Sequence, residues 1–100
     1  MDTQKTAQPT PINVLHNLAQ QRFECEVDGM LCRADYQRSN DVMHLTHTEV
    51  PQALAGRGIA AALVAAALAH ARIEKLQVNP ACSYVRSYMQ RHPETHSLRT

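Results

Sequence analysis

The Asp28-Gly29 dipeptide restricts the possible folds of this chain more than any other feature of its sequence. A two-residue type I′ turn needs positive φ at both central positions, which Asp-Gly adopts at little steric cost. The flanking residues 21–36 alternate between apolar and polar types, as the strands of a half-buried hairpin do. Counting outward pairs Val27 with Met30, Cys25 with Cys32 and Phe23 with Ala34 on a core face, and Glu24 with Arg33 and Arg22 with Asp35 on a solvent face.

The other elements are predicted from local composition. Residues 42–50 read as a third strand that closes at Pro51, and a short strand at 12–16 is expected before the hairpin. The alanine-rich stretch 56–75 favours a long helix, because alanine has the highest helix propensity. A strand at 76–78, stopped by Asn79-Pro80, and a second helix at 83–92, ended by Pro93, complete the order.

This order of elements predicts an α/β (α+β) fold. A strand, a crossover helix and a further strand form a right-handed unit whose strands are parallel. The sheet should therefore be mixed and mostly antiparallel, with one parallel pair at its end and two main helices. We expect residues 12–100 to form a single domain, and residues 1–11, which are polar and contain two prolines, to be a disordered leader.

Composition and charge exclude several classes of partner. Ten basic and nine acidic residues give a formal charge of +1, so no electrostatic field favours nucleic acid or an anionic membrane. The longest apolar run, residues 59–69, is too short to cross a bilayer core of about 30 Å. The N-terminal segment lacks the apolar region of an export signal, and three cysteines are an odd number, so we expect a cytoplasmic protein with reduced thiols.

The stretch from Ala55 to Ala60 lies between the third strand and the long helix. Gly56 and Gly58 let the backbone bend sharply and approach a ligand closely. The N–H groups of a first helical turn have no partner within the helix, and the helix dipole adds positive charge, so a pyrophosphate fits there. An ordinary tight loop with a solvated Arg57 is an equally good interpretation from spacing alone.

A resemblance to a known family adds to this interpretation. The stretch resembles the acetyl-CoA motif of the GNAT superfamily, R/Q-x-x-G-x-G/A, with Gly58 and Ala60 at its last two fixed positions and Ala55 replacing the usual Arg or Gln. The chain is more closely similar to the small single-domain GNAT-like acetyltransferases. Their motifs correspond here to His47-Thr48-Glu49-Val50-Pro51, Gly56-Arg57-Gly58-Ile59-Ala60 and Cys82-Ser83-Tyr84, and the resemblance covers residues 23–93.

The resemblance implies a minimal GNAT fold in which the parallel strands splay apart around acetyl-CoA. It implies that Thr48, Glu49 and Val50 line the pantetheine arm. The pyrophosphate would lie on the turn formed by Ala55, Gly56, Arg57, Gly58, Ile59 and Ala60.

Three residues are candidates for the chemistry of acyl transfer. Cys82 precedes the second helix, whose N-terminus would favour a thiolate able to accept an acetyl group, although a buried structural cysteine is as common. His47 alternates with Met43 and Leu45 and could be a general base or a core histidine. Tyr88 resembles the superfamily tyrosine that protonates the leaving thiolate, or forms one packed ridge with Tyr84.

The sequence leaves three functional hypotheses open. The first is an acetyl-CoA-dependent N-acetyltransferase acting on an amine of a small molecule or protein, as a monomer or weak homodimer. The second is a non-catalytic acyl-CoA-binding module, and the third is an interaction protein that binds no CoA. No metal is expected, because His44 and His47 are three residues apart on a strand and should point to opposite faces.

Overall fold

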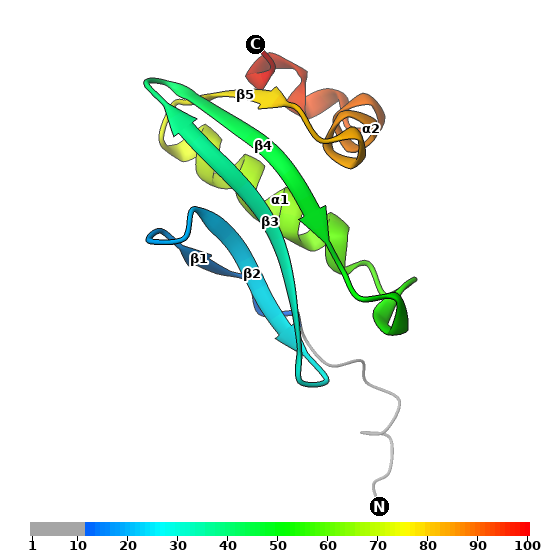
Figure 1. Ribbon diagram of the computed structural model, residues 1–100. Coiled ribbons are helices and arrows are strands. Elements are labelled where there is room, and N and C mark those ends of the chain that lie inside the picture. The colour runs from blue at the N-terminus through cyan, green and yellow to red at the C-terminus, as the bar shows by residue number, and fades with distance from the viewer. Residues whose placement is uncertain (1–11) are drawn as a thin grey trace, which may run out of the picture.

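The computed structural model describes residues 12–100, which form one five-stranded sheet with two main helices (Figure 1). The strand order is β1-β2-β3-β4-β5, with antiparallel neighbours except for the parallel pair β4 and β5. The mixed α+β fold predicted from the sequence is thus confirmed. The strands are β1 (Leu15–Asn17), β2 (Arg22–Val27), β3 (Met30–Ser39), β4 (Val42–Glu49) and β5 (Gln77–Pro80).

Helix α1 (Ile59–Ile73) makes the crossover from β4 to β5, and α2 (Ser83–Arg91) follows β5. Two 3₁₀ helices, η2 (Gln52–Leu54) and η3 (Pro93–Leu98), lie before α1 and after α2. The disordered leader predicted at residues 1–11 lies outside the described residues.

The β2–β3 hairpin has the register that the Asp28-Gly29 turn predicts. Asp28 and Gly29 have φ values of 52° and 76°, as a type I′ turn requires. The five predicted cross-strand pairs all occur, from Val27 opposite Met30 to Arg22 opposite Asp35. Period-2 patterning and turn chemistry together therefore determine this part of the sheet.

Several element boundaries differ from the predicted ones. The first strand is Leu15–Asn17 rather than 12–16, and the long helix begins at Ile59 rather than at 56, since Gly58 has φ 78° and forms its N-cap. The prediction that Asn79-Pro80 stops the last strand is wrong. These two residues pair with His44 and Leu45 of β4, and proline is tolerated because β5 lies near the sheet edge.

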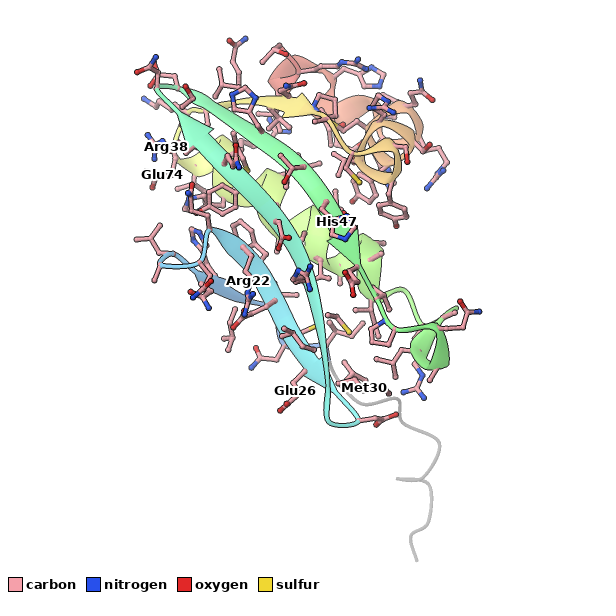
Figure 2. The ribbon with its side chains drawn as sticks, viewed as in Figure 1. Arg22, Glu26, Met30, Arg38, His47 and Glu74 are labelled. Carbon is pink, nitrogen blue, oxygen red and sulfur yellow. The ribbon has the colours of Figure 1, made fainter. Side chains whose placement is uncertain are left out.

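The core lies between α1 and the sheet face that the hairpin pattern predicted to be buried. Residues of α1 at helical spacing face inward: Ile59, Leu63, Val64, Ala67, Leu68 and Ala71. They pack in one cluster with Phe23, Cys25, Tyr36 and Leu45 from the strands. The opposite face of the sheet carries the polar partners, and Figure 2 shows Arg22 and His47 on that outer face.

A β-bulge at Thr46 reverses which side chains at the end of β4 face the core. Tyr36 of β3 pairs with Leu45, whereas the adjacent Asp35 pairs with His47, so Thr46 is an extra residue on β4. Beyond the bulge the alternation is reversed, and His47 lies on the outer face while Thr48 turns inward. The prediction that His47 shares a face with Met43 and Leu45 is therefore wrong, as is the prediction that His44 and His47 face opposite ways.

Candidate functional site

The turn between β4 and α1 has the backbone that its two glycines predict. Gly56 and Gly58 have φ values of 84° and 78°, a region that residues with a side chain rarely adopt. A Cβ atom at either position would meet nothing within 4 Å, so the glycines are required by backbone conformation and not by crowding. The space in front of both residues is open to a ligand.

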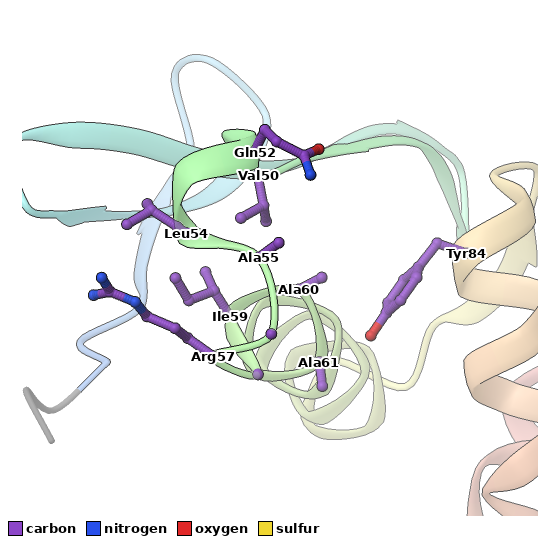
Figure 3. A pocket seen from close by; sticks show the side chains of 11 residues that line it. Val50, Gln52, Leu54, Ala55, Arg57, Ile59, Ala60, Ala61 and Tyr84 are labelled. Atoms are coloured by element: carbon purple, nitrogen blue, oxygen red, sulfur yellow. The ribbon is translucent and has the colours of Figure 1, made fainter.

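A pocket of about 270 Å3 opens at this turn (Figure 3). All six residues predicted to hold the pyrophosphate line it, from Ala55 to Ala60. The first helical hydrogen bond of α1 runs from the Ala62 N–H to the Gly58 carbonyl, so the preceding N–H groups of the first turn have no carbonyl partner within the helix. A pocket that meets a helix N-terminus in this way suits an anion.

The pocket also has walls that the sequence did not predict. Val50 lines it as expected for a residue beside the pantetheine arm, and Gln52, Leu54, Ala61 and Tyr84 complete it. Tyr84 comes from the start of α2 and faces the turn from across the opening (Figure 3). Its place in the Cys82-Ser83-Tyr84 motif was the one sequence signal that could have identified it.

The parallel strands separate next to this pocket. Their ladder ends at Leu45 and Pro80, where the Cys82 N–H donates to the Leu45 carbonyl at 3.0 Å. Beyond that bond β4 continues to Glu49, whereas the other chain segment turns into α2. The side chains of Thr48 and Cys82 meet across the divergence, with Oγ1 and Sγ 3.6 Å apart. The structure thus brings together two of the predicted site residues, both near the pocket.

The surroundings of Cys82 favour its thiolate. Burial raises the pKa of this thiol, but hydrogen bonds from the Val85 N–H, the Thr48 hydroxyl and the N–H groups of Tyr84 and Thr48 outweigh burial and lower the pKa below its ordinary value. Cys82 is the N-cap of α2, where the N–H groups of the first turn have no carbonyl partner within the helix. Since the donors of the first helical turn face the sulfur, they gain most when it is charged.

His47 lies away from these residues, on the outer face of the sheet. Its Nε2 is 3.1 Å from Glu49 Oε1, and the Arg33 guanidinium reaches the same carboxylate at 3.2 Å. The hydrogen bond with His47 and the charge of Arg33 lower the pKa of the Glu49 carboxyl. The Glu49 side chain therefore belongs to an outer-face network and does not line the pocket.

Tyr88 does not reach the pocket at the turn. It is buried and stacks on His92 with ring centroids 3.9 Å apart. A separate hollow that it lines is formed with Leu68, Arg72 and Thr95, at the other end of α1. The structure thus places Tyr84, and not Tyr88, beside the predicted nucleotide turn.

A membrane-spanning helix and a metal-binding cluster are both absent from the described part of the chain. Within residues 12–100, no helix combines the length and apolar character needed to cross a membrane. The same residues contain no group of three or more His, Cys, Asp or Glu side chains arranged to hold a metal ion.

Comparison with known proteins places this geometry in a family. Residues 22–98 match the family model of the GCN5-related N-acetyl-transferases. Protein NATD1 of Gallus gallus is 36% identical over 90 residues, which cover 86% of this chain and 81% of the relative. Protein NATD1 of Homo sapiens is also 36% identical over 90 residues, covering 86% and 79%. That name states no activity.

A solved structure has the same fold. The solution structure of a GCN5-like candidate N-acetyltransferase from Staphylococcus aureus superposes with a TM-score of 0.72. The match covers 89% of this chain and 88% of the other, at 21% sequence identity. At that identity the likeness extends to the fold alone.

Proposed function

Because the chain belongs to the family of GCN5-related N-acetyltransferases, we propose that it binds acetyl-CoA and transfers the acetyl group to an amine. Membership supports acetyl transfer as a general activity. The ligand, the acceptor and the residues that perform the reaction are parts of the proposal.

The observation that carries this proposal is the position of the pocket. It is lined by the glycine turn at the start of α1, by Val50 just after β4 and by Tyr84 at the start of α2, which lie on the two segments that diverge beyond Leu45 and Pro80. A nucleotide pyrophosphate would accept hydrogen bonds from the N–H groups of the turn. The pantetheine arm would then extend along Thr48, Glu49 and Val50, on the edge of β4 that faces away from β3 and has no pairing with β5 beyond Leu45.

Two routes for the acetyl group are compatible with this geometry. In the direct route the amine attacks the thioester carbonyl and CoA leaves as a thiolate that must gain a proton. In the other route the Cys82 thiolate attacks first, releases CoA and holds the acetyl group until the amine attacks the new thioester. The lowered pKa of Cys82 supports its candidacy as the nucleophile.

The remaining roles are assigned by position. Tyr84 is the better candidate to protonate the leaving thiolate, because it lines the pocket and Tyr88 does not. His47, hydrogen-bonded to Glu49, would deprotonate an amine that approaches from the outer face of the sheet.

A specific observation also favours the second candidate function, a non-catalytic acyl-CoA-binding module. The three residues predicted to be catalytic are not assembled around one point: Cys82 lies at the divergence, His47 on the outer face and Tyr88 at the far end of α1. Binding of acetyl-CoA without turnover of any amine would select this candidate.

Calorimetric titration of the reduced protein with acetyl-CoA tests the proposal. Ala60→Glu places a carboxylate among the residues that line the pocket, at the second position of α1. An acidic residue there suits the helix dipole, so the helix should remain folded. We expect the wild-type protein to bind acetyl-CoA and Ala60→Glu to bind it with an affinity lower by about tenfold or more. The expected change is on the order of the repulsion between close charges at a protein surface.

Ala69→Glu is the matched control for this titration. Ala69 is exposed on the same helix, about 13 Å further along its axis, so the net charge changes equally without a carboxylate in the pocket. The control should bind as the wild type does. Failure of the wild-type protein to bind either acetyl-CoA or CoA would contradict both candidate functions.

A further inference from the structure

Arg57, the positively charged residue of the nucleotide turn, forms an ion pair with a carboxylate from a different part of the chain. Arg57 Nη1 lies 3.0 Å from Oδ2 of Asp28, which occupies the first central position of the β2–β3 turn. Both side chains are about half exposed, at 49% and 52%. The tip of the hairpin is therefore tied to the loop that precedes α1.

This ion pair matters because of what lines the pocket. Among the described residues that form it, Arg57 carries the single full charge. Figure 3 shows its side chain extending from the turn away from Tyr84, so the guanidinium lies on the far side of the turn from that wall. Asp28 offsets this positive charge.

We propose that Asp28 limits the affinity of the nucleotide site by holding the Arg57 guanidinium away from the pocket, and that a bound phosphate takes the guanidinium over from this carboxylate. The inference rests on the proposed function and deepens it. A ligand that needs a freed Arg57 binds with an apparent affinity reduced by the fraction of molecules in which the arginine is free. Removing the competing carboxylate should then strengthen binding, whereas removing a residue that merely positions Arg57 would weaken it.

The substitution Asp28→Asn distinguishes a gain from a loss of affinity without disturbing the turn. Asp28 has φ 52°, and asparagine tolerates this left-handed region well. Asn-Gly is a preferred pair for the type I′ turn, so the hairpin register should be preserved. The variant removes the charge and leaves the local backbone as it is.

Titration of wild-type protein and Asp28→Asn with CoA and with pantetheine tests the proposal. An exposed ion pair is worth little, so we expect the variant to bind CoA about two- to fivefold more tightly at low salt. The gain should shrink at high salt, which screens exposed charges. Pantetheine lacks the nucleotide phosphates and should bind both proteins equally. Unchanged or weaker binding of CoA by Asp28→Asn would overturn the proposal.

Two variants sharpen this test. Glu26→Gln removes an equal charge from an exposed position of the same hairpin and should leave the affinity for CoA at the wild-type value. In an Arg57→Gln background the gain from Asp28→Asn should be smaller, because no guanidinium remains to be released. A gain of the same size in that background would overturn the competition for Arg57. Wild-type protein that binds no CoA would instead refute the proposed function itself.

Discussion

At the scale of single residues, the candidate site depends on which way a few side chains point. Cys82 is one of three free cysteines, and its neighbours lower its pKa. Cys25 is buried on the core face opposite Cys32, and burial together with that neighbouring thiol raises the pKa of Cys25 to about 11. The pKa of the same residue type is therefore lowered at one position and raised at another, because Cys82 meets hydrogen-bond donors at a helix N-terminus and Cys25 lies in the core.

Alkylation of the native protein by iodoacetamide should follow this difference. We expect mass spectrometry to show one modified thiol, Cys82, with a pH midpoint below the ordinary value for cysteine. Thr48→Val removes one donor to the thiolate and should raise that midpoint towards the ordinary value.

Thr46→Val controls for the loss of a hydroxyl on the same strand, since the Thr46 hydroxyl bonds the Asp35 carbonyl and not the sulfur. It should leave the midpoint where it is in the wild type. A midpoint at or above the ordinary value, or one that Thr48→Val does not move, would contradict the stabilised thiolate.

At the scale of elements, α1 contributes both to the pocket and to the core. Its N-terminus forms the floor of the pocket, and its inward face supplies much of the core. Leu63 is completely buried on that face, two residues after Ala61, the last residue of α1 that lines the pocket. The orientation of the helix end therefore depends on how its middle packs against the sheet.

Leu63→Ala should lower the free energy of unfolding by about 2–5 kcal/mol, because it leaves a cavity in the core. Urea unfolding followed by circular dichroism measures this change. Ile73→Ala, at a position 75% exposed on the same helix, should change stability by less than about 0.5 kcal/mol. Equal effects of the two substitutions would show that α1 is packed differently.

At the scale of the whole molecule, four elements meet around His16. Its Nε2 lies 2.6 Å from the Tyr36 hydroxyl, and its ring stacks on Phe23 with centroids 4.2 Å apart. The ring of His70 from α1 meets it edge-on at 4.5 Å. Burial and the neighbouring His70 lower the pKa of His16, so β1, β2, β3 and α1 are held together around an uncharged imidazole.

This cluster predicts a loss of stability in mild acid. Since the folded pKa of His16 lies below its ordinary value of 6.5, the unfolded chain binds the proton more readily. The contribution of the uncharged His16 to the free energy of unfolding is complete above about pH 6.5 and is lost as the pH falls below that value. Urea unfolding at several pH values should show this slope, and His16→Gln should flatten it while lowering stability throughout.

His44→Gln is the control for the acid effect, because His44 lies on the outer face, where its Nδ1 contacts the Asn79 amide at 3.0 Å. That variant should keep the wild-type dependence on pH. An unchanged slope in His16→Gln would exclude His16 as its source.

The sequence by itself determined what depends on local backbone and periodicity. The Asp28-Gly29 turn determines the register of the hairpin, alanine content determines α1, and Gly56 and Gly58 determine the left-handed turn before it. These features could be predicted because each follows from the residue at the position and its near neighbours. The order of the elements added the mixed sheet, and the family motifs added the nucleotide turn at which the pocket opens.

Only the tertiary structure decided which side chains meet. The bulge at Thr46 turns His47 outward, the start of α2 brings Tyr84 to the pocket, and the hairpin tip brings Asp28 to Arg57. One extra residue in a strand reverses every later side chain, and contacts between residues far apart in sequence depend on how the elements pack. For this physical reason the nucleotide turn could be predicted, whereas the arrangement of the residues around it could not.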